Sequence, residues 1–329
     1  MNKNKRVYPP VGMYSILIGI LVLLVSLTLI IWKIELLLSS TLGLVVVSTL
    51  GFNLFLFLAI VFDINLLSTR RNPNRIVMDE KTGNKLITVA LTAYNDELSI
   101  FDSVLDFLAH PNVKRVIVVD NNSTDKTASF AESAGALVIC EEKQGYGHCV
   151  YRALFEASKY IDTELVILCE GDLTFRARDI DKFLAYEAHG DIINGTRISE
   201  QLRMPDTQLT NFIYFGNFFV GKLLEVKHLG KGTITDVGTT YKLCKSKYLR
   251  ENLLCYNSSI NHEFNAHFLD KSLEIGARIV EVPITFYKRV GQSKGGNRSN
   301  SAAIKVGLKM IKGIALGWPT EKKKKEKRF

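Results

Sequence analysis

Residues 115–125 read RVIVVDNNSTD. Several other segments between residues 86 and 197 have the same pattern, a short apolar run that ends in polar residues. Arg115 to Val119 is a short, mostly apolar run typical of a buried β-strand, and six polar residues follow it from Asp120. We predict similar strands at 86–91, 137–140, 165–169 and 191–194, with helical patterns between them. Apolar strands that alternate with helices indicate an α/β fold, in which a mostly parallel sheet carries helices on both faces.

Polar residues stand where most of these predicted strands end. Thr92–Glu97 (TAYNDE) follows the strand at 86–91, and Glu170-Gly171-Asp172 follows the strand at 165–169. Gly195-Thr196-Arg197 follows the strand at 191–194. Because open α/β sheets bind ligands at the carboxyl ends of their strands, these segments predict one shared ligand site.

Several other classes of site are disfavoured by composition and spacing. The chain carries 42 Lys+Arg against 33 Asp+Glu, and most of the excess lies at its two ends, which argues against a nucleic-acid groove across the fold. Gly145-x-Gly147 lacks the third glycine of a dinucleotide-binding loop. His262 and His267 are spaced i, i+5 rather than the i, i+4 of a zinc-protease helix.

Two uncharged apolar runs, 11–32 and 36–62, precede the α/β pattern. A helix of 22 residues reaches about 33 Å, and the hydrocarbon core of a bilayer is about 30 Å thick, so we expect a transmembrane hairpin. Lys3, Lys5 and Arg6 precede the hairpin and three arginines between 70 and 75 follow it. The positive-inside rule then places both termini and everything after the hairpin in the cytoplasm. A buried hairpin of a soluble protein is the alternative.

The segment 299–318 has the pattern of a basic amphipathic helix. Apolar residues recur at i, i+4, i+7 and i+11 from Ile304, and lysines repeat beside them from Lys305. With Trp318 at its end, such a helix is expected to lie on an anionic membrane surface, and the basic tail 319–329 would strengthen the attachment. A packed surface helix is the alternative. The full predicted order is a basic N-terminus (1–10), two spans (11–32 and 36–62), a linker (63–84), the α/β domain (85–298), the amphipathic helix (299–318) and the tail (319–329).

Taken together, the motifs resemble those of family 2 glycosyltransferases with the GT-A fold. The similarity is closest to the dolichyl- and polyprenyl-phosphate sugar transferases. The elements that carry it are 92–97 (TAYNDE), 118–125 (VVDNNSTD), 145–147 (GYG), 170–172 (EGD), 194–197 (NGTR), 235–239 (TDVGT), and the segment of 282–294 with VPI, YKR and SK. Each element is short, but seven in the family's order cover residues 85 to about 295.

The resemblance implies a site and a metal ion. It implies that the donor nucleotide is bound by Ala93, Tyr94, Asn95, Glu97, Asp120, Gly145 and Gly171. It implies Mg²⁺ or Mn²⁺ on Asp172 with Glu170 as a second ligand, because hard cations prefer carboxylate oxygens. Arg197, Arg289 and Lys294 are the expected phosphate-binding and acceptor-binding residues. The expected catalytic residues are Asp172, Asp236 and Arg289.

The expected activity is transfer of a hexose from a UDP- or GDP-sugar to a polyprenyl phosphate at the cytoplasmic leaflet, with inversion at the anomeric carbon. A phosphomonoester needs no base, because its second pKa near 6 leaves it largely ionised at pH 7. One alternative is a glycan or protein hydroxyl acceptor, for which Asp236 would be the base. Another is a catalytically silent, membrane-tethered nucleotide-binding module, since Glu170 stands where the family has aspartate. The expected partners are the nucleotide sugar, the acceptor and membrane lipids, and no nucleic acid.

Overall fold

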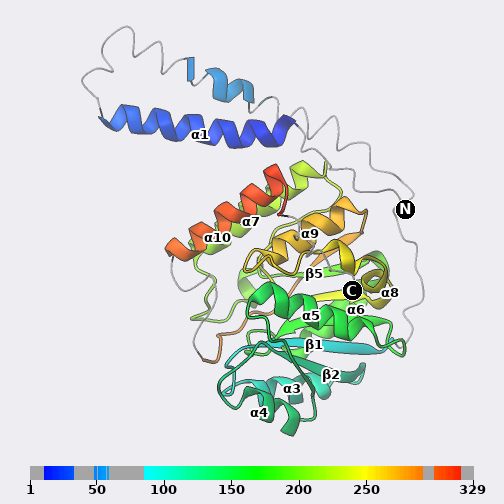
Figure 1. Cartoon of the computed structure of the whole chain (residues 1–329). Helices are drawn as coiled ribbons and strands as arrows, with labels where there is room; N and C mark the ends of the chain where they lie inside the picture. The colour runs from blue at the N-terminus through cyan, green and yellow to red at the C-terminus, as the bar shows by residue number, and fades with distance from the viewer. Residues whose placement is uncertain are drawn as a thin grey trace, which may run out of the picture. The chain divides into compact units, whose positions relative to one another are not determined.

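The computed structural model describes residues 11–32, 48–49, 51–56, 58, 85–291 and 300–319. The chain divides into two units, one made of 1–75 and 223–231 and the other of 76–222 and 232–329. The second unit carries the α/β domain that the sequence predicts, with strands and helices alternating along the chain (Figure 1). The two units are described separately below.

The described residues of the second unit form a seven-stranded sheet with the order β3-β2-β1-β4-β6-β5-β7. Its strands are β1 (Ile87–Ala93), β2 (Val113–Asp120), β3 (Leu137–Cys140), β4 (Leu165–Glu170), β5 (Ile192–Thr196), β6 (Lys242–Lys245) and β7 (Ile279–Pro283). Only β6 runs antiparallel to its neighbours among these strands. The carboxyl ends of β1, β2 and β4 therefore meet at one edge, with Ala93 paired to Asp120 and Thr92 paired to Glu170.

Helices pack against this sheet, among them α3 (Ile100–Leu108), α4 (Thr127–Ser133), α5 (Tyr146–Ser158), α6 (Ile180–Tyr186) and α8 (Ser246–Asn252). The other helices of this part of the chain are α7 (Asn211–Lys227), α9 (Phe264–Glu274) and α10 (Asn300–Leu316), and α10 packs on α9. Side chains of α3, α4 and α6 share one core with alternate residues of β1, β2 and β4. Because successive strand residues point to opposite faces, the other alternate residues, such as Ile117 and Val119, face away from that core.

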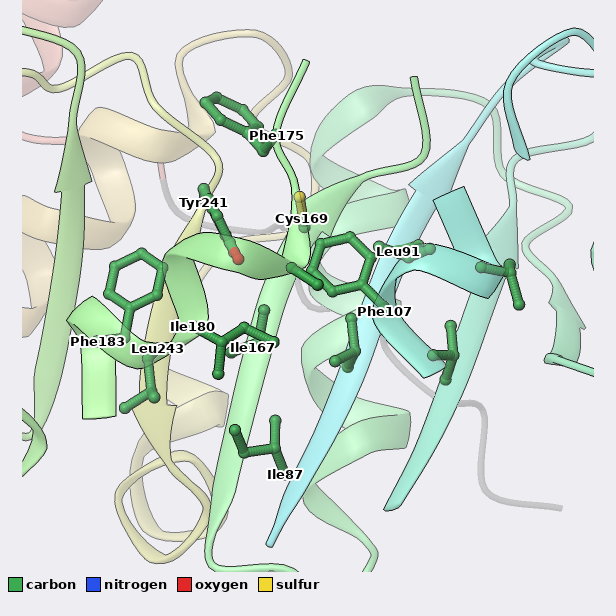
Figure 2. Packing of buried hydrophobic residues seen from close by; sticks show 14 of the residues in the cluster. Ile87, Leu91, Phe107, Ile167, Cys169, Phe175, Ile180, Phe183, Tyr241 and Leu243 are labelled. Carbon is green, nitrogen blue, oxygen red and sulfur yellow. The ribbon is translucent and has the colours of Figure 1, made fainter. Parts of the chain in front are cut away.

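An aromatic cluster holds the middle of this core together. Tyr241, which directly precedes β6, is fully buried, and its ring lies 4.8 Å from that of Phe183 and 5.3 Å from that of Phe175 (Figure 2). Phe107 of α3 makes an edge contact with the same ring at 6.1 Å. The Tyr241 hydroxyl donates to the carbonyl of Arg176 at 3.0 Å, so its one polar group is satisfied. The cluster fixes the start of β6 beside the end of β4.

The five predicted strands are confirmed with boundaries shifted by two residues or fewer. Two strands were not predicted. β6 has only four residues with a lysine at each end, and β7 ends in a proline, so neither shows the apolar run of a buried strand. Lys242 is nevertheless completely buried, and its ammonium donates to the carbonyl of Thr239.

In the first unit, α1 (Val11–Trp32) coincides with the first predicted span. Residues 51–56 are also helical and approach α1 at Gly19, where an added Cβ would lie 3.2 Å from Oδ1 of Asn53. Within the described ranges, no helix was found that is both long enough and apolar enough to span a bilayer. The predicted transmembrane hairpin is therefore not confirmed, and most of its second span (36–62), the linker 63–84 and the tail beyond 319 lie outside the described residues.

Candidate active site

A cavity of about 580 Å³ lies at the carboxyl edge of the sheet in the second unit. Its polar part is lined by residues from the ends of β1 and β4, from the segments after β5 and before β6, and from the segment after β7. They include Asp96, Glu170, Asp172, Arg197 and Arg289. Its apolar part is lined by α7 and α10. The volume is typical of a small-molecule site, and the position is where α/β sheets bind ligands.

Asp172 and Arg289 form the ion pair at the centre of the polar part. Nη1 of Arg289 lies 2.8 Å from Oδ2 of Asp172, and its Nη2 donates to Oδ1 of Asp96 at 3.0 Å. The other oxygen of Asp172 accepts from the backbone N–H of Thr174 at 3.0 Å and from its hydroxyl at 2.5 Å. The residue between them, Leu173, has φ of +65°, a left-handed conformation that costs a leucine about 1–2 kcal/mol. The turn thus holds the Asp172 carboxylate in a fixed position.

Hydrogen bonding leaves this pair incomplete. The approach of Arg289 to Oδ2 of Asp172 lacks the geometry of a hydrogen bond, so that buried oxygen accepts none from the described residues. Nε of Arg289 is likewise buried without an acceptor among them. Burial lowers the pKa of the Arg289 guanidinium, but the charges of Asp172, Glu170 and Asp96 outweigh burial and raise it. The pair therefore has one lone pair and one N–H donor still to be satisfied.

Glu170, the last residue of β4, shares the polar part of the cavity with Asp172. Burial, followed by the negative charge of Asp172, raises the pKa of Glu170 to about 7, although Arg289 and the Thr240 hydroxyl oppose the shift. Oε1 of Glu170 accepts from that hydroxyl at 2.8 Å. Thr240 in turn lies 2.5 Å from the phenol oxygen of Tyr146, to which Asn265 donates at 2.9 Å. The orientation of Glu170 is thus set by a chain of buried hydroxyl and amide groups.

The charge balance of the cavity fits a divalent cation. Three carboxylates and two guanidinium groups line it, so the lining has no net positive charge to neutralise a nucleoside diphosphate, and a cation that entered with the diphosphate would supply that charge. Within the described ranges, no group of three or more His, Cys, Asp or Glu side chains could hold a metal ion. Mg²⁺ in nucleotide enzymes commonly takes one or two carboxylates and completes its shell with phosphate oxygens and water. Asp172 and Glu170 could supply these one or two carboxylate ligands.

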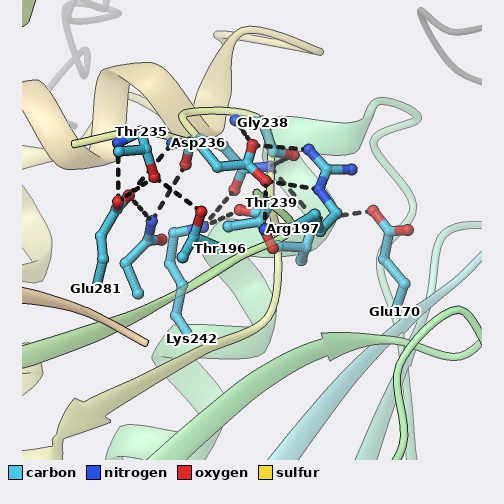
Figure 3. Close-up of polar contacts among 12 residues, drawn as sticks. Glu170, Thr196, Arg197, Thr235, Asp236, Gly238, Thr239, Lys242 and Glu281 are labelled. Carbon is cyan, nitrogen blue, oxygen red and sulfur yellow. Dashed lines mark hydrogen bonds and ion pairs between the residues drawn. The ribbon is translucent and has the colours of Figure 1, made fainter. Parts of the chain in front are cut away.

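Arg197 and Asp236 form a second buried pair, whose carboxylate is saturated. Nε and Nη2 of Arg197 donate to the two oxygens of Asp236 at 2.7 and 2.8 Å, and the backbone N–H groups of Arg197 and Gly238 each donate at 3.1 Å (Figure 3). Burial opposes ionisation, but the charge and hydrogen bonds of Arg197 lower the pKa of Asp236. Glu281 supports the loop from behind, accepting from the N–H and the hydroxyl of Thr235 at 2.8 and 2.6 Å.

This arrangement does not favour the hypothesis that Asp236 is a general base. A base needs a carboxylate oxygen with access to the substrate proton and a pKa near the working pH. Asp236 does not line the cavity, both of its oxygens are used, and its pKa is lowered rather than raised. Its geometry instead orients Arg197, which does line the cavity.

The predicted donor-binding residues divide into two groups. Ala93, Tyr94 and Gly145 line the cavity, whereas Asn95, Glu97 and Asp120 do not. The three that do not line the cavity accept hydrogen bonds from the loop that follows β2. Asp120 accepts from the backbone N–H and the hydroxyl of Ser123, Asn95 from the N–H of Thr124 at 2.8 Å, and Glu97 from the N–H of Lys126 at 3.1 Å. Asp120 still ends at the sheet edge, two strands or about 10 Å across from Glu170.

The two glycines predicted at the donor site, Gly145 and Gly171, are required for different structural reasons. Gly145 lines the cavity with φ of +144°, which other residues rarely adopt, and its N–H donates to Oδ1 of Asn121 at 2.8 Å. Gly171 does not line the cavity, and a Cβ there would come 2.5 Å from Cδ1 of Ile100. The structure therefore explains Gly171 by packing of the β4 end against α3. Lys294, predicted at the acceptor side, lies outside the described residues.

Among the cavity residues to which the sequence analysis gave no role are four polar ones that the structure joins by hydrogen bonds or ion pairs. Asp96 was quoted within its motif but assigned no role, and Tyr146, Thr240 and Asn265 were not considered as a unit. Asp96 directly follows residues that were assigned, so proximity in its motif was an available signal. The other three come from segments up to 119 residues apart in sequence, and no local pattern joins them.

Trp318, the residue expected at a membrane surface, contacts α9. Its indole N–H donates to Oδ2 of buried Asp270 in α9 at 2.7 Å. Its ring also packs on the imidazole of His267 at 5.1 Å. These contacts fix the end of α10, which is drawn beside α7 in Figure 1. Ile304 and Leu308 of α10 and Phe212 of α7 line the cavity and remain 47%, 61% and 47% exposed, so the apolar part opens to the outside.

Comparisons with known proteins agree with this geometry. A model of glycosyl transferase family 2 matches residues 88–253. A dolichyl-phosphate hexose transferase of Haloferax volcanii is 28% identical over 229 residues, which cover 68% of this chain and 94% of that protein. An uncharacterized glycosyltransferase of Mycobacterium tuberculosis is 38% identical over 112 residues, or 34% of this chain and 48% of the relative.

Solved structures share the fold. The crystal structure of glucosyl-3-phosphoglycerate synthase from Mycobacterium tuberculosis with Mn²⁺, UDP-glucose and phosphoglyceric acid aligns with a TM-score of 0.53 at 15% identity, covering 72% of this chain and 82% of that one. At this identity the likeness concerns the fold alone. Because the family model spans about half of the chain and the sheet-edge site lies within the same fold, the chain belongs to glycosyl transferase family 2 and has the GT-A fold.

Proposed function

We propose that the protein transfers a hexose from a UDP- or GDP-sugar to a polyprenyl phosphate. The observation that carries this proposal is the single cavity that joins a carboxylate- and arginine-lined part to an apolar part between α7 and α10. A sugar nucleotide is polar throughout, so it accounts for the first part only. A polyprenyl phosphate has a charged head and a hydrocarbon chain, which match both parts. The similar dolichyl-phosphate hexose transferase supports the same acceptor class.

In this reaction an oxygen of the acceptor phosphate forms the new bond to the anomeric carbon while the bond to the donor diphosphate breaks, and the configuration inverts. The nucleoside diphosphate leaves with its charge. Mg²⁺ or Mn²⁺ held by Asp172 and Glu170 would neutralise that charge when bound. The solved synthase that shares the fold was crystallised with Mn²⁺.

The two arginines orient the acceptor. Arg289, whose Nε has no acceptor among the described residues, and Arg197 both line the cavity, and guanidinium N–H groups donate charge-assisted hydrogen bonds to phosphate oxygens. No base is required, since the phosphomonoester is already largely ionised at neutral pH. This is consistent with the saturated state of Asp236.

We also propose that the first unit anchors the protein in the membrane, with the catalytic domain and both termini in the cytoplasm. The proposal rests on the uncharged runs 11–32 and 36–62 and on the basic residues that flank them. It is supported by the large apolar side chains that α1 exposes, such as Leu21 at 62% and Leu24 at 56%. Protease protection of sealed, oriented vesicles tests it: a digested catalytic domain in inside-out vesicles is expected, and a protected one contradicts the orientation.

The test of the activity uses the full chain purified in detergent. Panels of nucleotide sugars are incubated with farnesyl phosphate and Mn²⁺, and products are identified by mass spectrometry. We expect one nucleotide sugar to give a farnesyl-phosphate hexose and a free nucleoside diphosphate. Transfer to added sugar or peptide hydroxyls but not to the phosphate would replace the proposed acceptor. If the assay gives no product and nucleotide binding does not depend on Mn²⁺, the protein is catalytically silent.

A further inference from the structure

The two helices that wall the apolar part of the cavity each contain two glycines, and these glycines fall into two kinds. In α7 they are Gly216 and Gly221, and in α10 they are Gly307 and Gly313. Glycine inside a helix destabilises it by about 1 kcal/mol relative to alanine, because it loses more backbone freedom on folding. Each of the four therefore calls for a structural reason.

Close packing explains one glycine in each helix. A Cβ on Gly221 would lie 2.4 Å from the carbonyl oxygen of Ile234, which real Cβ atoms do not approach so closely. A Cβ on Gly313 would lie 2.4 Å from the ring of Trp318, the residue that fixes the end of α10. Any side chain at either position would displace its neighbour.

Packing does not explain the other two. A Cβ on Gly216 or on Gly307 would meet no heavy atom within 4 Å, so alanine would fit and would favour the helix. Both residues line the cavity, one from each helix. The two glycines therefore leave space beside the apolar part of the cavity that a side chain would fill. The same cavity contains the buried Oδ2 of Asp172, which accepts no hydrogen bond from the described residues, and the phosphate-compatible Arg197 and Arg289.

We propose that Gly216 and Gly307 set the width of the groove so that it accepts a methyl-branched isoprenoid chain. This inference rests on the proposed function and adds the two residues that select for the isoprenoid chain. The charged head lies at the arginines, so the first isoprene units of the chain follow between α7 and α10. An isoprenoid chain carries a methyl branch on every fourth carbon and needs more width than a straight alkyl chain. Side chains at the two glycines would occupy that width.

The test compares farnesyl phosphate with dodecyl phosphate as acceptors for the full chain and for Gly216→Leu, Gly307→Leu and the double variant. We expect kcat/KM for farnesyl phosphate to fall about tenfold or more in each single variant, while the value for dodecyl phosphate changes little, because a misfitting methyl group typically costs 10–200-fold in discrimination. Ser301→Leu, on α10 but outside the cavity lining, is the matched control and should leave both values unchanged. Leucine favours helix more than glycine does, so thermal stability should not fall.

The experiment distinguishes failure of the width inference from failure of the proposed lipid acceptor. If the unaltered protein uses both phosphates but the leucine variants keep the same ratio of kcat/KM values, the width inference is wrong and the proposed function stands. Equal losses on both acceptors would also overturn the width inference, since a simple blockage does not distinguish chains. If the unaltered protein uses neither phosphate, the lipid acceptor is wrong and the inference fails with it.

Discussion

Two buried arginine–aspartate pairs, Arg289–Asp172 and Arg197–Asp236, lie at the site but differ in hydrogen bonding. Asp236 accepts four hydrogen bonds, three of them from Arg197, and its pKa is lowered. Asp172 is equally buried, but one of its oxygens has only the nondirectional approach of Arg289. A saturated carboxylate has no capacity left for a ligand, whereas an unsaturated one does. We therefore propose that Asp236 supports the structure of the site and that Asp172 takes part in the chemistry.

The largest expected effect is on activity, from Asp172→Asn. An amide of the same size keeps the turn at 172–174 but removes the charge, so we expect transfer to fall by about 10²–10³-fold or more, the usual loss when an electrostatic stabiliser of the transition state is removed. The unfolding midpoint should change little. Initial rates with saturating donor and Mn²⁺ measure the effect, and Asp206→Asn, an exposed aspartate outside the cavity lining, is the control. Near-normal rates in Asp172→Asn would refute the role in chemistry.

The next effect is on stability, from Asp236→Ala. Removing one member of a buried pair leaves the Arg197 charge uncompensated, which typically costs about 3–5 kcal/mol of unfolding free energy. Asp172→Asn should cost less in the same denaturant titration, because Arg289 keeps its ion pair with Asp96 at 3.0 Å. Equal losses of unfolding free energy in the two variants would remove the distinction between framework and chemistry.

A smaller effect is expected from Glu170→Gln, which replaces the weaker of the two proposed metal ligands. Loss of one carboxylate commonly weakens metal binding by about 10–100-fold. We therefore expect the Mn²⁺ concentration for half-maximal rate to rise while the rate at saturating Mn²⁺ largely recovers. A fall in the saturating rate with no change in the Mn²⁺ requirement would place Glu170 outside the metal site.

The smallest effect is a change in the pH dependence of stability. Burial raises the pKa of Glu281 to about 7, so the folded protein binds a proton there that the unfolded chain releases above its ordinary pKa near 4.5. The stability from this group is present below about pH 4.5 and is lost as pH rises toward 7. Asp236 acts in the opposite sense, because its lowered pKa stabilises the fold above about pH 4.

Glu281→Gln should therefore flatten the fall in unfolding free energy between pH 5 and 7. Denaturant titrations at pH 5, 6 and 7 on the variant and the unaltered protein measure the slope. An unchanged slope would mean that Glu281 is ionised in the folded protein throughout this range.

The strands and the site edge could be predicted from sequence because both are local patterns. An apolar run followed by polar residues marks β1, β2 and β4, and the order of motifs marks the family. The direction of each side chain at that edge could not be predicted. Asp96 and Asp120 both follow strands, yet only Asp96 lines the cavity, because Arg289 reaches it from 193 residues away in sequence.

The C-terminal helix shows the same limit. Its amphipathic period was visible, and α10 forms within the predicted boundaries. The position of Trp318 depends on its contacts with Asp270 and His267 of α9. The apolar period of one helix contains no information about the helix that packs against it. The site is therefore predictable as a set of strand ends, while the roles within it depend on tertiary contacts.

We propose that Asp172 holds the cation that lets a nucleoside diphosphate bind in a cavity whose lining has no net positive charge. Calorimetric titration of UDP and GDP into the full chain, with and without Mn²⁺, tests it without requiring any acceptor. We predict binding of one nucleotide to the unaltered protein only when Mn²⁺ is present, and none to Asp172→Asn under either condition. Equal binding without Mn²⁺, or Mn²⁺-dependent binding that survives in Asp172→Asn, would contradict the account.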